Sequence, residues 1–400
     1  MPASPGAAEA ASSHSNFTAF LASLFLSKIA DQVLLFLVPL VVFQSTSDVA
    51  WSGLAFALEA FPRFLSFPIC GALCDRISPV RLMRWSQLWR ALVCVGGAIG
   101  GASIGGLAWL ITLSAICGVL TTQGAMAREV ILPQAFQRHR FEKVLAYSQT
   151  ADQVGAVLGP VLAAGFLALW QWPTAVAATA GIFLLGDLAL LWWQHSNLVP
   201  LHARGASHTT AWAAMLAGLR HIVLTPGLRK LVIEAAGINL VVGVTLASSA
   251  ALFTGQHGQS AARYGVLQTA GAITTVVILL GIAHISLPVR RMGLAAFVLM
   301  VLGGLLTALS ASVWGYALGY LLVIGLDKMF NVYLRSTRQK LIPLADFGKT
   351  TGVMAMLNNL SQPLAGLAIG VFAAQWTAGG VILALTGLMA LLGLVAARIK

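Results

Sequence analysis

Twelve long apolar runs fill most of this chain, and short polar connections separate them. A helix needs about 20 predominantly apolar residues to cross a bilayer, and these runs are continuous instead of alternating with a period of two. Hydrophobic residues make up 58% of the chain and charged residues only 9%, whereas soluble domains carry roughly 25% charged residues. We therefore expect an all-α membrane protein. The expected helices lie near 17–44, 51–73, 84–103, 106–127, 145–169, 174–194, 231–254, 260–286, 291–312, 314–334, 350–374 and 377–397.

The basic residues concentrate in every second connection. Most of the Lys and Arg residues lie in the loops 74–84, 128–144, 195–230, 287–291 and 335–349. The positive-inside rule places such loops in the cytoplasm. We therefore expect a multi-pass protein of the cytoplasmic (inner) membrane with both termini in the cytoplasm. The net charge of +12 is then explained by membrane topology, and no nucleic-acid partner is expected.

The longest basic loop divides the chain into two sets of six helices. Part of this loop, "AAMLAGLRHIVLTPGLRK", has the pattern of an amphipathic helix on the membrane surface, with Arg220, Arg229 and Lys230 near the lipid headgroups. The expected parts are an N-terminal cytoplasmic tail at 1–16, a six-helix half at 17–194, a cytoplasmic linker at 195–230 and a second six-helix half at 231–400.

The two halves also repeat each other. "SPVRLM" (78–83) recurs 209 residues later as "LPVRRM" (287–292), each time in the loop after the second helix. "REVILPQAF" (128–136) has a counterpart in "RQKLIPLADF" (338–347). Repeats in the same order indicate a duplicated six-helix unit. Duplicated transporter folds bind substrate near the bilayer midplane and work by rocking one half against the other.

The stretch "GALCDRISPVRL" (71–82) resembles the loop signature G-x-L-x-D-R-x-G-R-K of the major facilitator superfamily. The matching residues are Gly71, Leu73, Asp75 and Arg76. The basic pair of the signature is absent, and Arg81 supplies charge slightly later. In that family the loop is a conformational latch, and the resemblance implies this role for Gly71, Asp75, Arg76 and Arg81. His284 stands where Asp75 would recur, so the second copy departs from the signature.

The stretch "QVGAVLGPVLAAG" (153–165) resembles the fifth-helix signature of exporters in the same superfamily, G-x3-G-P-x2-G-G. Gly155, Gly159 and Pro160 match, and alanines stand at the final glycine pair. Small residues let membrane helices pack closely, and a proline bends a helix. The resemblance implies export. The fourth helix lacks the arginine usual in drug exporters, which argues against proton coupling by that route.

Several ionisable residues lie inside the apolar runs. Their insertion costs about 2.5–3.5 kcal/mol each, and such residues tend to mark substrate or ion pathways. Asp31 and Asp152 lie in helices that line the cavity in this superfamily, and a carboxyl group in a low dielectric can exchange a proton during transport. The candidate substrate-binding or proton-binding residues are Asp31, Asp152, Lys28, Arg63, Arg90 and Lys328.

Two substrate classes stay open. "NVYLRSTRQKLIP" and "SGLAFALEAFPRFLSFPICGALCDR" resemble the bacterial siderophore and drug exporters, including the enterobactin exporter. That resemblance implies efflux of an organic anion whose carboxylates meet Arg63, Arg90 and Lys328. "SKIADQ" and "TADQVGAVLGP" resemble the aspartate-bearing helices of ferroportin, which implies that Asp31 and Asp152 are ligands of iron, cobalt or manganese. The cysteine and histidine of ferroportin's second site have no counterpart in this chain.

The sequence contains no P-loop, HExxH or GxSxG motif, so neither ATP-driven transport nor an enzyme is expected. We expect a monomeric secondary transporter that works by alternating access and proton antiport. Its expected partners are a small-molecule substrate, protons and the lipid bilayer, and no cofactor is expected.

Overall fold

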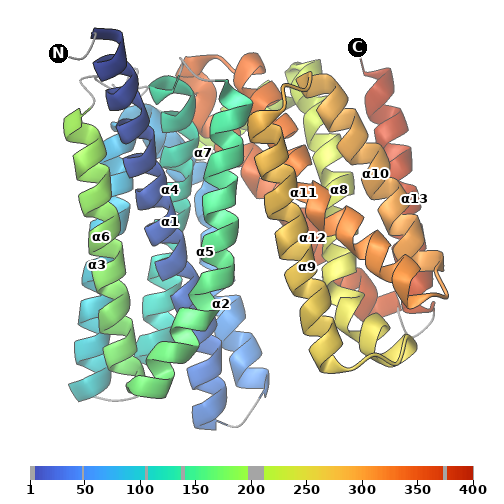
Figure 1. Cartoon of the computed structure of the whole chain (residues 1–400), viewed down its shortest axis with the longest axis horizontal. Coiled ribbons are helices and arrows are strands. Elements are labelled where there is room, and N and C mark those ends of the chain that lie inside the picture. The colour runs from blue at the N-terminus through green and yellow to red at the C-terminus, as the bar shows by residue number, and fades with distance from the viewer. Residues whose placement is uncertain are drawn as a thin grey trace. The chain divides into compact units, whose positions relative to one another are not determined.

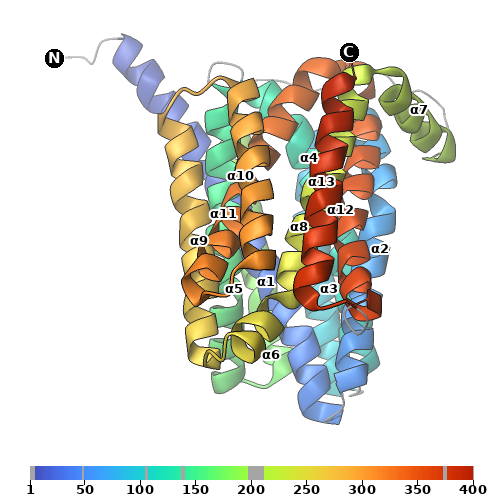
Figure 2. The same ribbon diagram turned by 90° about the vertical axis from the view of Figure 1, so that its right-hand side faces the viewer.

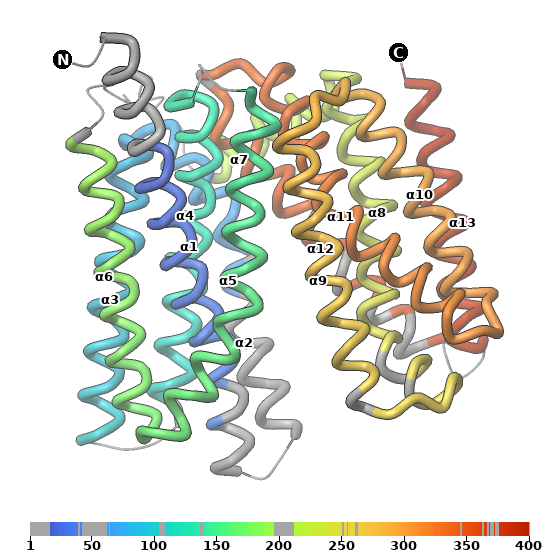
Figure 3. The backbone as a smooth tube through the Cα atoms, viewed as in Figure 1, coloured from blue at the N-terminus to red at the C-terminus, as the bar shows by residue number. Residues whose placement is uncertain are grey.

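The chain is helical throughout the residues that a computed structural model describes (Figure 1). The described residues are 5–46, 49–103, 107–136, 140–196, 211–372 and 376–399, and Figure 3 colours the residues whose placement is certain. The first six helices are α1 (Pro5–Thr46), α2 (Val49–Arg76), α3 (Pro79–Ser103), α4 (Leu107–Ala135), α5 (Phe141–Leu169) and α6 (Trp172–Ser196). The others are α7 (Ala211–Leu224), α8 (Pro226–Ala250), α9 (Ala261–His284), α10 (Val289–Leu309), α11 (Val313–Leu341), α12 (Phe347–Phe372) and α13 (Ala378–Arg398). A π-helical turn, Ala251–Gln256, follows α8, and a 3-10 turn, Leu344–Asp346, precedes α12.

All of these helices except α7 are long enough to cross a bilayer. The shortest of the long ones, α10 and α13, have 21 residues, and a rise of about 1.5 Å per residue carries such a helix across a hydrocarbon core of about 30 Å. Over the described residues, nine helices are both long and apolar enough to span a membrane. These features confirm the predicted all-α membrane fold.

Several helices extend further than expected. At their N-terminal ends, α1 begins at Pro5 instead of near 17 and α3 begins at Pro79 instead of near 84. At their C-terminal ends, α4 and α11 run on into segments expected to be loops.

The sequence predicts loops from residue 128 and from residue 335, but α4 continues to Ala135 and α11 continues to Leu341. In α4 the added segment buries Val130, Ile131 and Leu132, so packing carries the helix beyond Arg128. In α11 the added segment contains arginine, glutamine and lysine, which are good helix formers. The predicted loop boundaries at these two places are therefore wrong, and Arg128 belongs to a helix.

Residues 1–136 and 150–208 form one compact unit. In this unit α1 packs against α2 and α6, while α3 packs against α4 and α6. Leu37, Leu110 and Phe183 are fully buried in its apolar core. The inward face of α3 instead carries buried polar side chains, among them Gln87 and Arg90. The core of this unit is therefore apolar in one part and polar in another.

Residues 137–149 and 209–400 form the second compact unit. In it α8 packs against α11, α12 and α13, and α10 packs against α11 and α13 (Figure 2). Val244, Tyr316 and Tyr320 lie in its apolar core. The short helix α7 lies against α12. It belongs to the segment 195–230, for which a linker is expected, and residues 197–210 of that segment lie outside the described residues.

Candidate substrate-binding site

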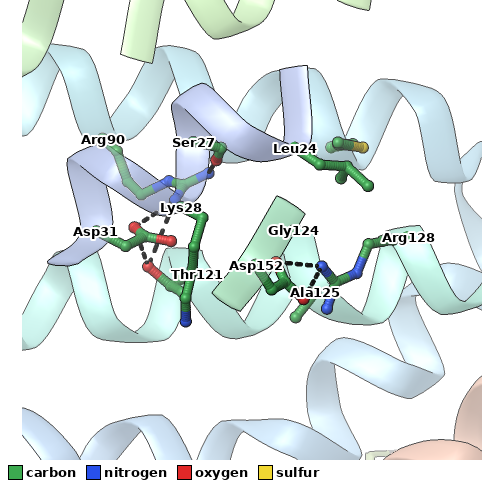
Figure 4. Close-up of a pocket in the computed structure, with 11 residues that line it drawn as sticks. Leu24, Ser27, Lys28, Asp31, Arg90, Thr121, Gly124, Ala125, Arg128 and Asp152 are labelled. Carbon is green, nitrogen blue, oxygen red and sulfur yellow. Dashed lines mark hydrogen bonds and ion pairs between the residues drawn. The ribbon is translucent and has the colours of Figure 1, made fainter. Parts of the chain in front are cut away.

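A small polar cavity lies inside the first unit, and α1, α3, α4 and α5 supply its lining (Figure 4). Its volume is about 100 Å³, enough for a few water molecules at about 30 Å³ each. The lining residues are Leu24, Ser27, Lys28, Asp31, Met83, Arg90, Thr121, Gly124, Ala125, Arg128 and Asp152. Four of the six predicted substrate-binding or proton-binding residues thus surround one cavity.

The pair Asp31 and Arg90 joins α1 to α3. The Arg90 side chain is only 2% exposed, and its Nη1 lies 2.6 Å from Asp31 Oδ1. Thr121 of α4 donates a second hydrogen bond to the same oxygen at 2.8 Å. The remaining Arg90 donors meet the Ser86 carbonyl at 3.0 Å and the Ser27 hydroxyl at 2.9 Å. Buried charges are stable only when they are paired and hydrogen-bonded in this way.

The pair Asp152 and Arg128 joins α5 to α4. Arg128 Nη1 donates to both carboxylate oxygens of Asp152, at 2.8 and 2.7 Å. Figure 4 shows this pair and the Asp31 pair on opposite sides of Lys28. A carboxylate that already accepts charge-assisted hydrogen bonds has fewer lone pairs left for another ligand.

The third cation of the cavity, Lys28, does not form an ion pair of the kind that Arg90 and Arg128 form with the two aspartates. Among the described residues its ammonium group has no hydrogen bond and no ion-pair partner within 4.0 Å, although Asp31 and Asp152 attract it electrostatically. Lys28, Arg90 and Arg128 carry three formal positive charges. Asp31 and Asp152 carry two formal negative charges. The lining residues therefore carry one more formal positive charge than negative charges, which favours an anionic ligand.

Glycines hold the helices of this cavity together. A Cβ atom at Gly155 would lie 2.9 Å from Lys28 Cγ, and one at Gly159 would overlap Gln32 Cβ, so α5 approaches α1 more closely than any larger residue allows. On α4, a Cβ at Gly124 would lie 2.8 Å from Ser86 Oγ. Pro160 lies inside α5, directly after Gly159. The proposed packing motif thus lies where the cavity wall is formed.

Two predicted site residues are not among those that line this cavity. Arg63 is partly buried in α2, and its carbonyl accepts a hydrogen bond from Thr122 at 3.3 Å. Lys328 belongs to α11 in the second unit, where its Nζ lies 2.7 Å from Asp327 Oδ2.

The predicted latch residues surround the short turn between α2 and α3. Gly71 is buried within the last turns of α2, Asp75 is partly buried, and Arg76 ends the helix. Arg81 is exposed in the first turn of α3. Asp75 therefore lies four residues before the N-terminus of α3, whose unpaired backbone amides favour a nearby negative charge.

Arg128 is not among the predicted site residues, because it directly follows an apolar run and resembles the first residue of a basic loop. Thr121 and Ser27 are not among them either, because a hydroxyl residue in an apolar helix most often bonds its own backbone. Thr121, Gly124 and Arg128 are spaced i, i+3 and i+7, so an extended helix would have placed all three on the same face.

No group of three or more His, Cys, Asp or Glu side chains that could hold a metal ion occurs in the described part of the chain. The four cysteines are all buried and free. In the cavity, Asp31 and Asp152 each engage an arginine, and Lys28 adds positive charge. This donor set does not fit a divalent cation.

Comparison with protein-family models shows to which family the chain belongs. The model of the Major Facilitator Superfamily matches residues 20–365. The chain belongs to the Major Facilitator Superfamily. This membership supports transport of a small substrate across a membrane by a multi-pass protein, and superfamily members are transporters, not enzymes. No curated protein sequence matches the chain significantly.

Solved structures of superfamily members share the fold of this transporter. A bacterial homologue of the iron transporter ferroportin, in an outward-facing state, is 17% identical with a TM-score of 0.74, over 96% of this chain and 98% of that chain. The human organic anion transporter MFSD10 (TETRAN) is 18% identical with a TM-score of 0.75, over 96% and 99% of the two chains. The transporter FucP, in the outward conformation, is 13% identical with a TM-score of 0.72, over 96% and 98%. At these identities the likeness shows the fold alone.

Proposed function

We propose that this transporter exports a small organic compound with an anionic group, of the siderophore or drug-like class, by alternating access coupled to proton antiport. The observation that carries this proposal is the ammonium group of Lys28, which faces the polar cavity without an ion-pair partner within 4.0 Å among the described residues. An uncompensated charge within a membrane helix is costly. An anionic substrate would remove that cost when it binds.

The two arginines limit where the anion can bind. Arg90 and Arg128 are already paired with Asp31 and Asp152, so Lys28 is the cation that an incoming carboxylate meets first. The cavity volume of about 100 Å³ accepts one anionic group of a substrate and not a whole drug-sized molecule. The rest of the substrate would have to lie outside this cavity.

Proton antiport places a further requirement on the substrate. Substrate and proton must compete for the same groups, and Asp31 and Asp152 are the carboxylates available in this cavity. A substrate with a basic centre beside its anionic group would have to open one of the two ion pairs, Asp31–Arg90 or Asp152–Arg128, to compete with a proton for an aspartate, and its anion would lie against Lys28. We therefore propose a zwitterionic substrate. The glycine motif of α5, which resembles that of exporters, supports the outward direction.

The alternative function is ferroportin-like efflux of iron, cobalt or manganese, with Asp31 and Asp152 as ligands. The resemblance of α1 and α5 to the ferroportin helices supports it. The ion pairs of both aspartates and the positive charge of Lys28 oppose it, because a divalent cation would have to displace two guanidinium groups and lie beside an ammonium group. Two carboxylates are also a thin coordination shell.

Localisation in the cytoplasmic membrane, with both termini in the cytoplasm, is part of the proposal. The alternation of basic and uncharged connections supports it. Cysteines introduced one at a time at Arg76 and at Ser312 in a cysteine-free protein would test it. We expect an impermeant maleimide added outside intact cells to label position 312 and not position 76; the reverse pattern would contradict this sidedness.

The function is tested in proteoliposomes that enclose a pH-sensitive dye. The probes are a zwitterionic quinolone carboxylate, citrate and Mn²⁺, each added to wild type, Lys28→Gln and Asp31→Asn. We expect proton flux with the zwitterion alone, weakened about 10- to 100-fold in apparent affinity by Lys28→Gln, because a charge-assisted contact contributes about 1.5–3 kcal/mol. Lys340→Gln, at the exposed end of α11, is the matched control.

The other outcomes separate the alternatives. Proton flux with Mn²⁺ that Asp31→Asn abolishes and Lys28→Gln enhances would replace the proposal with metal efflux. Flux with citrate but not with the zwitterion would retain the anion site and overturn antiport by competition at an aspartate.

A further inference from the structure

A second, larger cavity lies in the second unit, and residues of α8, α10, α11 and α13 line it. Figure 2 shows these four helices. Its volume is about 520 Å³, within the range of roughly 300–1,000 Å³ typical of ligand pockets. None of its lining residues belongs to the candidate substrate site, and the sequence motifs do not account for it. We refer to this cavity as the α10–α13 groove.

The walls of the α10–α13 groove are apolar and open to the outside of the helix bundle. Leu294 and Leu394, which flank it on the two helices, are 65% and 66% exposed. Val298 and Leu302 extend the exposed wall along α10, each 47% exposed. These side chains lie in segments long and apolar enough to cross a membrane, so the groove faces the hydrocarbon of the bilayer.

One end of the groove is positively charged. Lys230 and Arg290 both line it, within the first two turns of α8 and α10. Arg290 is exposed and has no hydrogen bond or ion pair with any described residue. The one acidic lining residue, Glu234, lies 3.8 Å from Lys230 Nζ and accepts a hydrogen bond from the Tyr333 hydroxyl at 3.2 Å. The positive charge of Arg290 is therefore uncompensated.

The corresponding place in the first unit is closed by an ion pair. With the repeat offset of 209 residues, Gly293 of α10 corresponds to Arg84 of α3. Arg84 Nε lies 3.3 Å from Asp187 Oδ1 of α6, and this pair joins α3 to α6. Gly293 has no side chain to fill the equivalent space, and a Cβ there would overlap the ring of Tyr333. The second copy thus lacks the bridge that the first copy has.

We propose that the α10–α13 groove binds an anionic phospholipid. Its acyl chain would lie against Leu294, Val298 and Leu394, and its phosphate would lie against Arg290, with Lys230 beside it. Three features define this occupant: a hydrocarbon-facing apolar wall, a cationic end at the termini of the spanning helices, and the N-terminus of α10, which has no side-chain cap and whose backbone amides favour a negative charge. A soluble ligand would not need a wall that opens to the bilayer.

Native mass spectrometry of the full chain in detergent tests this proposal, with phosphatidylglycerol and phosphatidylcholine of identical acyl chains as probes. We expect phosphatidylglycerol to bind more tightly, and Arg290→Gln to weaken it about fivefold, as expected from about 1 kcal/mol per basic residue at a lipid headgroup. Arg291→Gln is the matched control: Arg291 is the exposed neighbour on the same helix and does not line the groove.

A second variant tests the apolar part. Ala390→Trp places a large ring in the groove from α13, where Ala390 is only partly buried. We expect it to remove tight phosphatidylglycerol binding while the protein elutes and unfolds like wild type. Equal affinity for the two lipids would overturn the proposal. So would equal losses in Arg290→Gln and Arg291→Gln, which would show attraction to surface charge alone, or unchanged binding in a folded Ala390→Trp variant.

Discussion

The cavity of the first unit depends on a few contacts between single side chains. Arg90 has the most of these: it contacts Asp31, Ser27 and the Ser86 carbonyl, and its guanidinium lies 4.5 Å from the centre of the Phe183 ring. An arginine with so many partners fixes the positions of α1 and α3 relative to each other. A substitution of Arg90 should therefore lower the free energy of unfolding of the protein.

Arg90→Met should destabilise the protein by about 3–5 kcal/mol, because it leaves the Asp31 carboxylate buried without its cation. The double variant Arg90→Met/Asp31→Leu should recover most of this loss, since it removes both charges. Thermal unfolding of the detergent-solubilised variants measures the order of stabilities. Arg81→Met, an exposed arginine of the same helix, should change stability by less than about 0.5 kcal/mol. A double variant no more stable than Arg90→Met would contradict the argument.

Gly159→Ala should destabilise the protein by about 1–3 kcal/mol, a typical cost of overpacking. The added Cβ would overlap Gln32 Cβ and lie 3.2 Å from Gln32 Cα, so that α1 itself would have to move. Gly165→Ala is the control on the same helix, because nothing lies within 4 Å of a Cβ there; alanine's better helix propensity should leave it equally stable or more stable. Equal melting temperatures for the two variants would show that α1 and α5 are not in close contact at Gly159.

At the scale of helices, hydrophobic patterning predicted nearly all of the fold. Each apolar run became one helix, because the backbone of a spanning segment must satisfy its own hydrogen bonds. The pattern could not locate the ends of α4 and α11, since hydropathy reports the bilayer and not helix hydrogen bonding. For the site it identified Lys28, Asp31, Arg90 and Asp152 as charges within the apolar runs, but not Arg128, which directly follows the fourth run.

The helix α7 should lie in the membrane interface. It buries Ala214 and Ile222 and exposes Trp212, Leu216 and Val223, which follow one another along one side of the helix. A nitroxide attached to Leu216→Cys, in protein without the four native cysteines, should be more accessible to oxygen than to a polar nickel reagent. The same label at Ala217→Cys, which is exposed away from this side, should show the opposite preference. Equal accessibility at both positions would place α7 in water.

At the scale of the whole molecule, transport requires exchange between states, and the turn between α2 and α3 is the predicted latch. Asp75→Asn should slow transport roughly fivefold, because a carboxylate near a helix N-terminus contributes up to about 1 kcal/mol and does so in one state only. Transport rates in proteoliposomes, normalised to the amount of protein, measure the effect. His284→Gln, at the corresponding place of the second copy, should transport at the wild-type rate. Equal slowing in both variants would remove the special role of Asp75.

The two halves of the chain differ at corresponding positions of the predicted repeat. Leu299 of α10 stands where the repeat would place Arg90, and Gly293 stands where it would place Arg84. At these positions the first half has arginines that form ion pairs, whereas the second half has a leucine and a glycine, and the glycine lines the proposed lipid groove. Substitutions along α10 and α13 can therefore adapt the protein to a different membrane composition, because they leave every charge of the first unit in place. Under the two proposals, contact with lipid and binding of the cargo use different halves of the chain, and each can evolve without the other.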